Sequence, residues 1–174
     1  MNVVSRTLLI AFLLVAITQR AHATCQTDTS VYPWMYEEIL TDTKFSGNCA
    51  DWVKTGSATR MQVGSNWLVE FDGTGTLTQT QTAGTYTNGM SAYFVVYVIA
   101  GTPGTERLHA QILQGSTVVE TMDVISPADS SGGSEYPIGD YSNTEFSVRF
   151  KFEPGMSPGT TKFRVDNVQV WGFF

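Results

Sequence analysis

The chain has 174 residues, of which sixteen are acidic and ten basic, and its formal net charge is −6. Without residues 1–23, which have the pattern of a secretion signal, eight basic residues remain and the net charge is −8. This charge argues against nucleic acid as a partner, because phosphates repel an acidic surface that lacks a concentrated basic patch. The one close basic set is interpreted as solvated positions on two strands: Arg149, Lys151, Lys162 and Arg164.

Residues 1–23 resemble a secretory signal peptide in their order of features. Arg6 is the only early charge, an apolar run covers Leu8–Ile17, and Ala21-His22-Ala23 has the small-x-small pattern of a cleavage site. The apolar run is too short for a bilayer core about 30 Å thick, and no later stretch is apolar over the roughly 20 residues that a membrane helix needs. We therefore expect a secreted or periplasmic monomer without a membrane span, with one domain over residues 24–174.

About 150 mature residues suit a single domain that buries close to 70% of its unfolded surface. Cys25 and Cys49 are the only cysteines in the sequence. Export favours a disulfide between them, which would close a loop of about 25 residues and stabilise the fold by about 3 kcal/mol. Ala23-Thr24 is a poor context for a lipid anchor on Cys25, and two thiols with one mature histidine, His109, do not easily form a tetrahedral zinc site.

Helix signals are weak, since Thr, Val, Gly, Ser and aromatic residues dominate, and one short helical turn is predicted at Trp34–Leu40. The rest of the pattern predicts strands between turn signals such as Asp72-Gly73 and Asn88-Gly89, with a polar loop over Ser126–Ser134. In chain order, weaker candidates at Thr41–Phe45 and Trp52–Gln62 precede clear strands at Asn66–Asp72, Gly75–Gln81, Met90–Ala100, Arg107–Gln114, Thr117–Val124, Thr144–Glu153 and Thr161–Gly172. This spacing predicts an all-β protein, a two-sheet antiparallel β-sandwich.

Two strands have informative side-chain patterns. Met90–Ala100 is apolar on both faces, which predicts a central strand. In the last strand, Phe163 and Val165 share one parity, whereas Val168 and Val170 share the other. A β-bulge at Asp166-Asn167 or a change of partner is therefore expected. The predicted core comprises Tyr93, Val95, Tyr97, Ile99, Leu108, Ile112, Phe146, Val148, Phe150 and Phe163.

Four segments form an ordered pattern: Ile39–Gly47 followed by Trp52, Val69–Gly75 with Gln79, Tyr93-x-Val-x-Tyr-x-Ile99, and Phe163–Val168. Together they resemble jelly-roll carbohydrate-binding modules of the family four and nine type and, more broadly, galactose-binding-like domains. The resemblance spans about residues 38–171. It implies two stacked sheets, a ligand surface on a concave sheet or at the loop edge, and a structural calcium ion near Asp42 and Asp166. Ser46 stands where the family has a glutamate, which removes one carboxylate from that calcium site.

Sugar binding needs flat aromatic rings for the apolar faces of pyranoses and planar polar side chains for the hydroxyls. Trp67 is assigned to the core because it shares parity with Val69 and Phe71, and Trp52 because it matches a packing position of the family. Aromatic and polar residues expected outside the core remain as ligand-binding candidates: Tyr136 and Tyr141 in a loop, His109, Gln111 and Arg149 on outward rows of strands, and Trp34 in the N-terminal turn.

Three functions remain open: a non-catalytic module that recognises a glycan or cell-surface polysaccharide, a structural or adhesive cell-surface sandwich without a small ligand, and a small glycoside hydrolase. Catalysis is disfavoured, because His109 is the only mature histidine for a triad and no Gly-x-Ser-x-Gly motif accompanies it. Glu120 and Asp123 differ in parity, so they do not form the carboxylate pair of a glycosidase on one strand face. No catalytic residue and no cofactor other than calcium is therefore assigned.

Overall fold

The computed structural model describes residues 36–46 and 51–174. Within these ranges the chain forms eleven strands and no helix. The strands are β1 Tyr36–Glu38, β2 Val53–Gly56, β3 Thr59–Val63, β4 Asn66–Phe71, β5 Gly75–Thr82, β6 Met90–Ile99, β7 Arg107–Gln114, β8 Thr117–Ile125, β9 Gly132–Ile138, β10 Glu145–Glu153 and β11 Lys162–Phe173.

The predictions on the first part of the chain lie outside these residues. They concern the signal peptide, Trp34 as a ligand residue, and the disulfide between Cys25 and Cys49. Over the described ranges, no helix has the length and apolar character needed to cross a bilayer.

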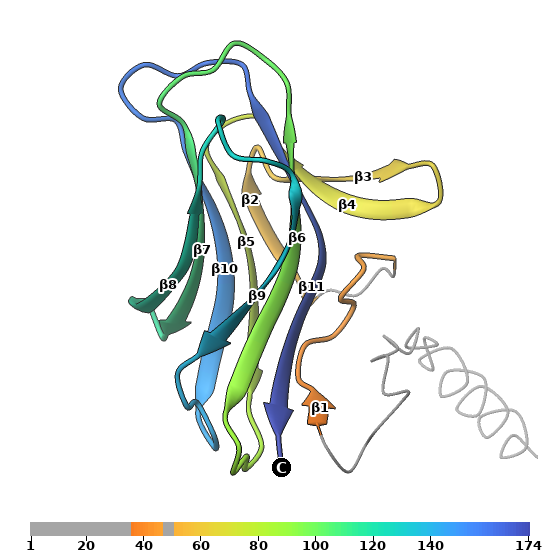
Figure 1. Ribbon diagram of the computed structural model, residues 1–174, viewed down its shortest axis with the longest axis vertical. Helices are drawn as coiled ribbons and strands as arrows, with labels where there is room; N and C mark the ends of the chain where they lie inside the picture. The colour runs from red at the N-terminus through yellow and green to blue at the C-terminus, as the bar shows by residue number, and fades with distance from the viewer. Residues whose placement is uncertain (1–35, 47–50) are drawn as a thin grey trace, which may run out of the picture.

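Two antiparallel sheets form the predicted sandwich. The larger sheet has the order β3-β4-β11-β6-β9, with β1 also paired to β11, and the smaller sheet has the order β2-β5-β10-β7-β8. Figure 1 shows the two layers facing each other, with the β3–β4 hairpin projecting from the sandwich. Strands β7, β8 and β10 bow toward the larger sheet, so the outward face of the smaller sheet is concave.

The seven clear predicted strands are confirmed, with ends that differ by one residue at most. The candidate Trp52–Gln62 is wrong as a single strand, because the chain crosses there from the smaller sheet (β2) to the larger one (β3). Gly56 makes this crossing possible: its φ is 60°, and a Cβ atom would lie 2.2 Å from the carbonyl oxygen of Thr74.

Three local predictions are corrected by long-range pairing. In place of the helical turn at Trp34–Leu40, Tyr36–Glu38 forms β1 because it pairs with residues 171–173 of β11. Thr41–Phe45 is not a strand, because two of its residues, Asp42 and Phe45, have left-handed φ angles of 45° and 52°. The predicted polar loop ends early at Gly132, where β9 begins. Its glycine and serine residues have low strand propensity, and the free edge of β6 supplies the partner.

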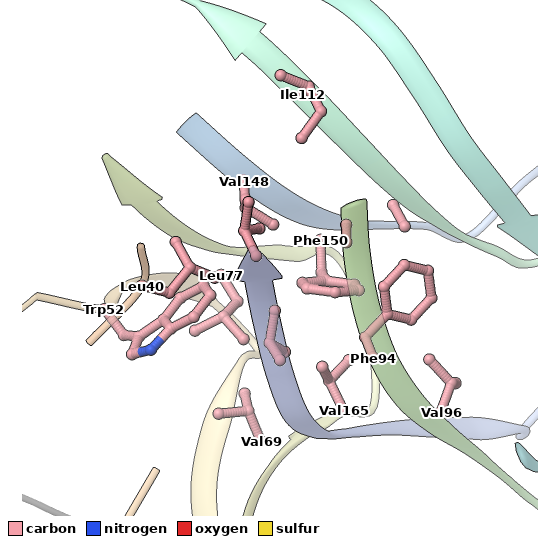
Figure 2. Close-up of a cluster of buried hydrophobic side chains, with 14 of the residues drawn as sticks. Leu40, Trp52, Val69, Leu77, Phe94, Val96, Ile112, Val148, Phe150 and Val165 are labelled. Atoms are coloured by element: carbon pink, nitrogen blue, oxygen red, sulfur yellow. The ribbon is translucent and has the colours of Figure 1, made fainter. Parts of the chain in front are cut away.

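The core lies between the two sheets, and Figure 2 shows side chains from both sheets entering it. Leu108, Ile112, Phe146, Val148, Phe150 and Phe163 are buried as predicted. The prediction for β6 took the wrong row: Ala92, Phe94 and Val96 are buried, whereas Tyr93, Val95, Tyr97 and Ile99 lie on the outward face and are partly exposed. Both rows are apolar, so alternation alone could not decide which one meets the smaller sheet.

The predicted β-bulge in the last strand is confirmed. The register between β11 and β6 shifts between Asp166 and Gln169, and Asn167 has a left-handed φ of 48°. The extra residue returns the following side chains to the inward face, so Phe163, Val165, Val168 and Val170 are all buried. The same strand pairs with β4 before the bulge and with β1 after it.

A buried carboxyl group lies at the junction of β1 and β11. Glu38 is 6% exposed, and its Oε1 atom accepts hydrogen bonds from the backbone N–H groups of Val170 (2.9 Å) and Leu40 (3.2 Å). Among the described residues, no partner hydrogen-bonds its Oε2 atom. Burial raises the pKa of Glu38 from 4.5 to about 7, because the loss of hydration outweighs the hydrogen bonds that stabilise the carboxylate.

Phe150→Ala should lower the free energy of unfolding by about 3–5 kcal/mol, because the ring is fully buried and its removal leaves a cavity. Urea unfolding measures this change. Phe174→Ala, the same substitution at a position 47% exposed, is the matched control and should cost less than about 1 kcal/mol. Equal losses in the two variants would contradict the assignment of faces on β10.

Glu38→Gln should alter the dependence of stability on pH. Because the pKa of Glu38 is raised in the fold, its contribution is fully present below pH 4.5 and is lost as the pH rises through about 7. The free energy of unfolding of the wild type should therefore fall relative to Glu38→Gln by about 3 kcal/mol between pH 4.5 and 8. Urea titrations at both pH values test this, with Glu145→Gln at an exposed strand position as the charge-loss control. Parallel pH profiles for wild type and Glu38→Gln would refute it.

Candidate functional site

The concave outward face of the smaller sheet holds three of the predicted ligand residues. Arg149 of β10 lies opposite Gln111 of β7, and the next outward pair is Lys151 with His109. All four residues belong to the neighbouring strands β10 and β7. They share the outward face because outward positions repeat every second residue along a strand. The structure therefore places Arg149, Gln111 and His109 on the outward rows of neighbouring strands, where Gln111 is only 9% exposed.

Arg149 and Gln111 form a planar polar pair. The Arg149 guanidinium donates two hydrogen bonds to Gln111 Oε1, from Nε at 3.1 Å and from one Nη at 2.7 Å. A guanidinium carries five N–H donors, so three remain for water or a ligand, and the Gln111 carboxamide retains its two N–H donors. The donors that a ligand can reach come mainly from the partly exposed guanidinium of Arg149, because Gln111 is only 9% exposed.

An ion-pair group lies beside this planar pair. Lys151 Nζ donates to Glu153 Oε1 at 2.5 Å, and His109 Nε2 lies 3.3 Å from Glu153 Oε2. The hydrogen bond from Lys151 holds the pKa of Glu153 below its ordinary value. Because Lys151 and Glu153 are 39% and 45% exposed, water screens their charges, and the main effect of the group is to fix side-chain positions rather than to add stability.

Hydroxyl groups and aliphatic side chains complete the concave face. Thr80 and Ser147 share a hydrogen bond of 2.7 Å between β5 and β10, and Thr55 and Thr76 share another of 2.7 Å between β2 and β5. The aromatic rings of β10 are all buried on the inward side: Phe146, Phe150 and Phe152. β2, β5, β7 and β8 contain no Phe, Tyr or Trp, so the described strands place no aromatic ring on this face.

Tyr136 and Tyr141 have a different place from the one predicted. Tyr136 lies within β9 rather than in a loop, and Tyr141 is only 7% exposed. Their hydroxyl groups donate to two carboxylates of β8: Tyr136 to Asp123 Oδ2, and Tyr141 to Glu120 Oε2 at 2.8 Å. Burial raises the pKa of both tyrosines. The exposure predicted for Tyr141 is therefore wrong, because the two rings close the side of the sandwich between β8 and β9.

Asp42 and Asp166, the predicted calcium ligands, are both buried. Among the described residues, no group of three or more His, Cys, Asp or Glu side chains could hold a metal ion. Burial raises the pKa of Asp166, and the positive charge of Lys44 opposes that rise. An ammonium group in that position disfavours a divalent cation, so this structure gives the predicted calcium ion a poor fit.

A recess that the sequence did not predict lies beside Trp67. Its volume is about 300 Å³, and its lining residues are Lys44, Ser46, Ser65, Asn66, Trp67, Asp166 and Asn167. The parity of Trp67 correctly predicted contact with the core. The bulge expected at Asp166-Asn167 was the one feature of the sequence that could have indicated this recess, since a bulge interrupts regular strand pairing.

Comparisons with known proteins bear on the fold. No family model and no curated protein matches the chain. Among solved structures, TmCBM61 in complex with beta-1,4-galactotriose has a TM-score of 0.57 at 12% identity, with 77% of this chain and 97% of that chain covered. A mutant of a family 29 carbohydrate-binding module has a TM-score of 0.50 at 13% identity, with 79% and 90% covered.

The arabinose-bound MgGH51 α-L-arabinofuranosidase has a TM-score of 0.54 at 13% identity, with 80% of this chain and 28% of that chain covered. These likenesses show that the chain has the jelly-roll fold of carbohydrate-binding modules. The more specific resemblance to the family four and nine type is not confirmed by them.

Tyr141→Phe should lower the free energy of unfolding by about 1 kcal/mol, because Glu120 loses one of its donors at a partly buried position and keeps the N–H of Gly139. Tyr97→Phe, on the outward face of β6, is the matched control and should change stability by less than about 0.5 kcal/mol. Thermal and urea unfolding measure both variants. A Tyr141→Phe protein as stable as the control would refute the role of the hydroxyl group in closing the sandwich.

Proposed function

We propose that the protein is a secreted or periplasmic, non-catalytic carbohydrate-binding module whose ligand surface is the concave face of the smaller sheet. The observation that carries this proposal is the planar Arg149–Gln111 pair on that face. The similarity of the fold to TmCBM61 and to a family 29 carbohydrate-binding module supports it.

The chemistry of the face suits a polyhydroxylated chain. Sugar hydroxyls are both donors and acceptors, and they are matched by the guanidinium and carboxamide groups and by the threonine and serine hydroxyls around them. Val53 and Val124 are exposed on strands at the two edges of this sheet and provide aliphatic contact area. Five strands about 4.8 Å apart give a surface roughly 20 Å wide, enough for an oligosaccharide rather than a single ring.

On this face the glycan is held by hydrogen bonds and aliphatic contacts. Such a surface is well hydrated before binding, and each protein–sugar hydrogen bond replaces one to water, so the net gain per bond is modest. Affinity then depends on several bonds formed together along the chain. We therefore expect longer oligosaccharides to bind more tightly than single sugars.

An adhesive function is the second candidate, and one observation favours it. Aromatic side chains gather on the outward face of the larger sheet, where Tyr36 lies 6.2 Å from Trp171 and 6.3 Å from Phe173, and Tyr93 stacks on Trp171 at 6.2 Å between ring centroids. Exposed aromatic patches mark many protein contact surfaces. A broad glycan screen without any binding, together with weakened adhesion in Trp171→Ala, would favour this function over the first.

Arg149→Ala and Gln111→Ala should each raise the Kd for a bound glycan about 10- to 100-fold, because each removes a planar hydrogen-bonding group worth about 1–3 kcal/mol. A glycan array that includes beta-1,4-galactotriose selects the ligand, and calorimetry measures the affinity. Arg164→Ala is the matched control: this arginine is also a strand residue with a side-chain partner, Glu70 at 2.8 Å, but belongs to the larger sheet. If the Arg149 and Arg164 variants lose affinity equally, or neither does, the concave face is not the ligand surface.

A further inference from the structure

The bulge in β11 opens a gap in the larger sheet. β4 pairs with β11 only over Val69–Phe71, opposite residues 163–165, whereas its first residues pair with β3. The bulge at Asp166-Asn167 follows directly, and the β3–β4 hairpin leaves the sandwich there, as Figure 1 shows. The recess of about 300 Å³ lies at this point of departure, and we call it the Trp67 pocket.

The Trp67 pocket combines one aromatic ring with polar and charged side chains. The other lining residues carry carboxamides (Asn66 and Asn167), a carboxylate (Asp166), an ammonium (Lys44) and hydroxyls (Ser46 and Ser65). Its volume is at the lower end of the range for small-molecule sites. The pocket therefore has room for one ring-sized polar molecule rather than for a chain.

The indole ring is held in place from one side. The guanidinium of Arg60 lies over the ring, 3.9 Å from its centroid, and Arg60 Nε donates to the carbonyl oxygen of Phe45 at 2.6 Å. A cation over the face of an indole is attracted by the π electrons. Trp67 thus lines the pocket as a ring whose orientation is fixed before a ligand arrives, which reduces the entropy lost on binding.

Asn167 supplies an acceptor without a donor. Its φ of 48° is tolerated because asparagine adopts the left-handed region more readily than most residues. In the described part of the chain, its Oδ1 atom is buried and has no hydrogen-bond partner. Asn167 lines the pocket, so a rotation of its side chain that turns Oδ1 toward a ligand hydroxyl group would give this atom the donor that it lacks.

The charges of the pocket favour a neutral ligand. Asp166 and Lys44 have opposite signs and interact electrostatically. A bound anion would meet the Asp166 carboxylate and a divalent cation would meet the Lys44 ammonium, so either would be repelled by one member of the pair. An uncharged polyol can donate to the carboxylate and accept from the ammonium at the same time.

We infer that the Trp67 pocket binds one uncharged pyranose ring, with the indole against an apolar side of the ring and with Asn66, Asn167 and Asp166 hydrogen-bonded to its hydroxyl groups. This site belongs to the larger sheet and uses no residue of the concave face. It extends the proposed function by a second, monovalent sugar site. A glycan that reached both surfaces would bind with avidity.

The test measures binding of single sugars to the mature protein. Methyl β-D-galactoside, methyl β-D-glucoside, methyl α-D-mannoside and methyl β-D-xyloside are titrated to about 50 mM, since a ligand of this size binds with a Kd in the millimolar range. Indole N–H signals in NMR spectra report contact with tryptophan, and Trp67→Phe assigns the signal that moves.

Two variants each remove one carboxamide group from the pocket and introduce no large side chain. Asn167→Gly keeps a residue that accepts the left-handed backbone, and Asn66→Ala removes the other carboxamide. Gln62→Ala is the matched control, because Gln62 is an exposed carboxamide on β3 of the same hairpin and does not line the pocket. Circular dichroism checks that each variant is folded. If Asn167→Gly does not fold, Asn66→Ala alone decides the result.

We expect at least one glycoside to bind saturably, to shift the Trp67 signal, and to lose affinity at least tenfold in Asn167→Gly and Asn66→Ala but not in Gln62→Ala or Arg149→Ala. Absence of saturable binding by all four glycosides overturns the inference, as does binding that both pocket variants retain. Sensitivity to Arg149→Ala alone also overturns it, because the sugar would then occupy the concave face. Oligosaccharide binding that depends on Arg149 would leave the proposed function intact in each of these cases.

Discussion

The β-bulge at Asp166-Asn167 is the constraint on which the larger sheet depends. A strand with strict alternation could not bury Phe163 and Val165 together with Val168 and Val170, because the two pairs differ in parity. The bulge adds one residue to β11 at Asn167, whose φ is left-handed, and this changes which residues point inward. All four side chains therefore reach the core. The bulge also separates the stretch of β11 that pairs with β4 from the stretch that pairs with β1.

Two surfaces of different chemistry follow from this arrangement. The concave face of the smaller sheet has unbroken pairing through β10, and its described strands carry planar polar groups and hydroxyls there but no aromatic ring. The Trp67 pocket exists because pairing in the larger sheet is interrupted, which leaves polar bulge atoms beside an indole. In this jelly roll the planar polar pair and the indole of the pocket therefore lie on different sheets.

The tyrosines show why the candidate site could be predicted only in part. Arg149, Gln111 and His109 lie on outward rows, which alternation with apolar neighbours predicts, but alternation did not predict that Gln111 is only 9% exposed. Tyr136 and Tyr141 follow a stretch rich in glycine and serine, which is typical of an exposed loop. The carboxylates that accept their hydroxyl hydrogens, Asp123 and Glu120, lie on a different sheet, and no local pattern records that contact.

By itself the sequence determined the two-sheet β-sandwich, the seven main strands and the need for a bulge in the last one, because side-chain alternation and turn residues are local signals. Only the tertiary structure decided which apolar row of β6 is buried, that β1 and β9 are strands, and that the first half of β4 leaves β11 to form a pocket. Each of these depends on a partner far away in the chain. Alternation defines two faces of a strand, but the sheet that packs against it decides which face becomes the interior.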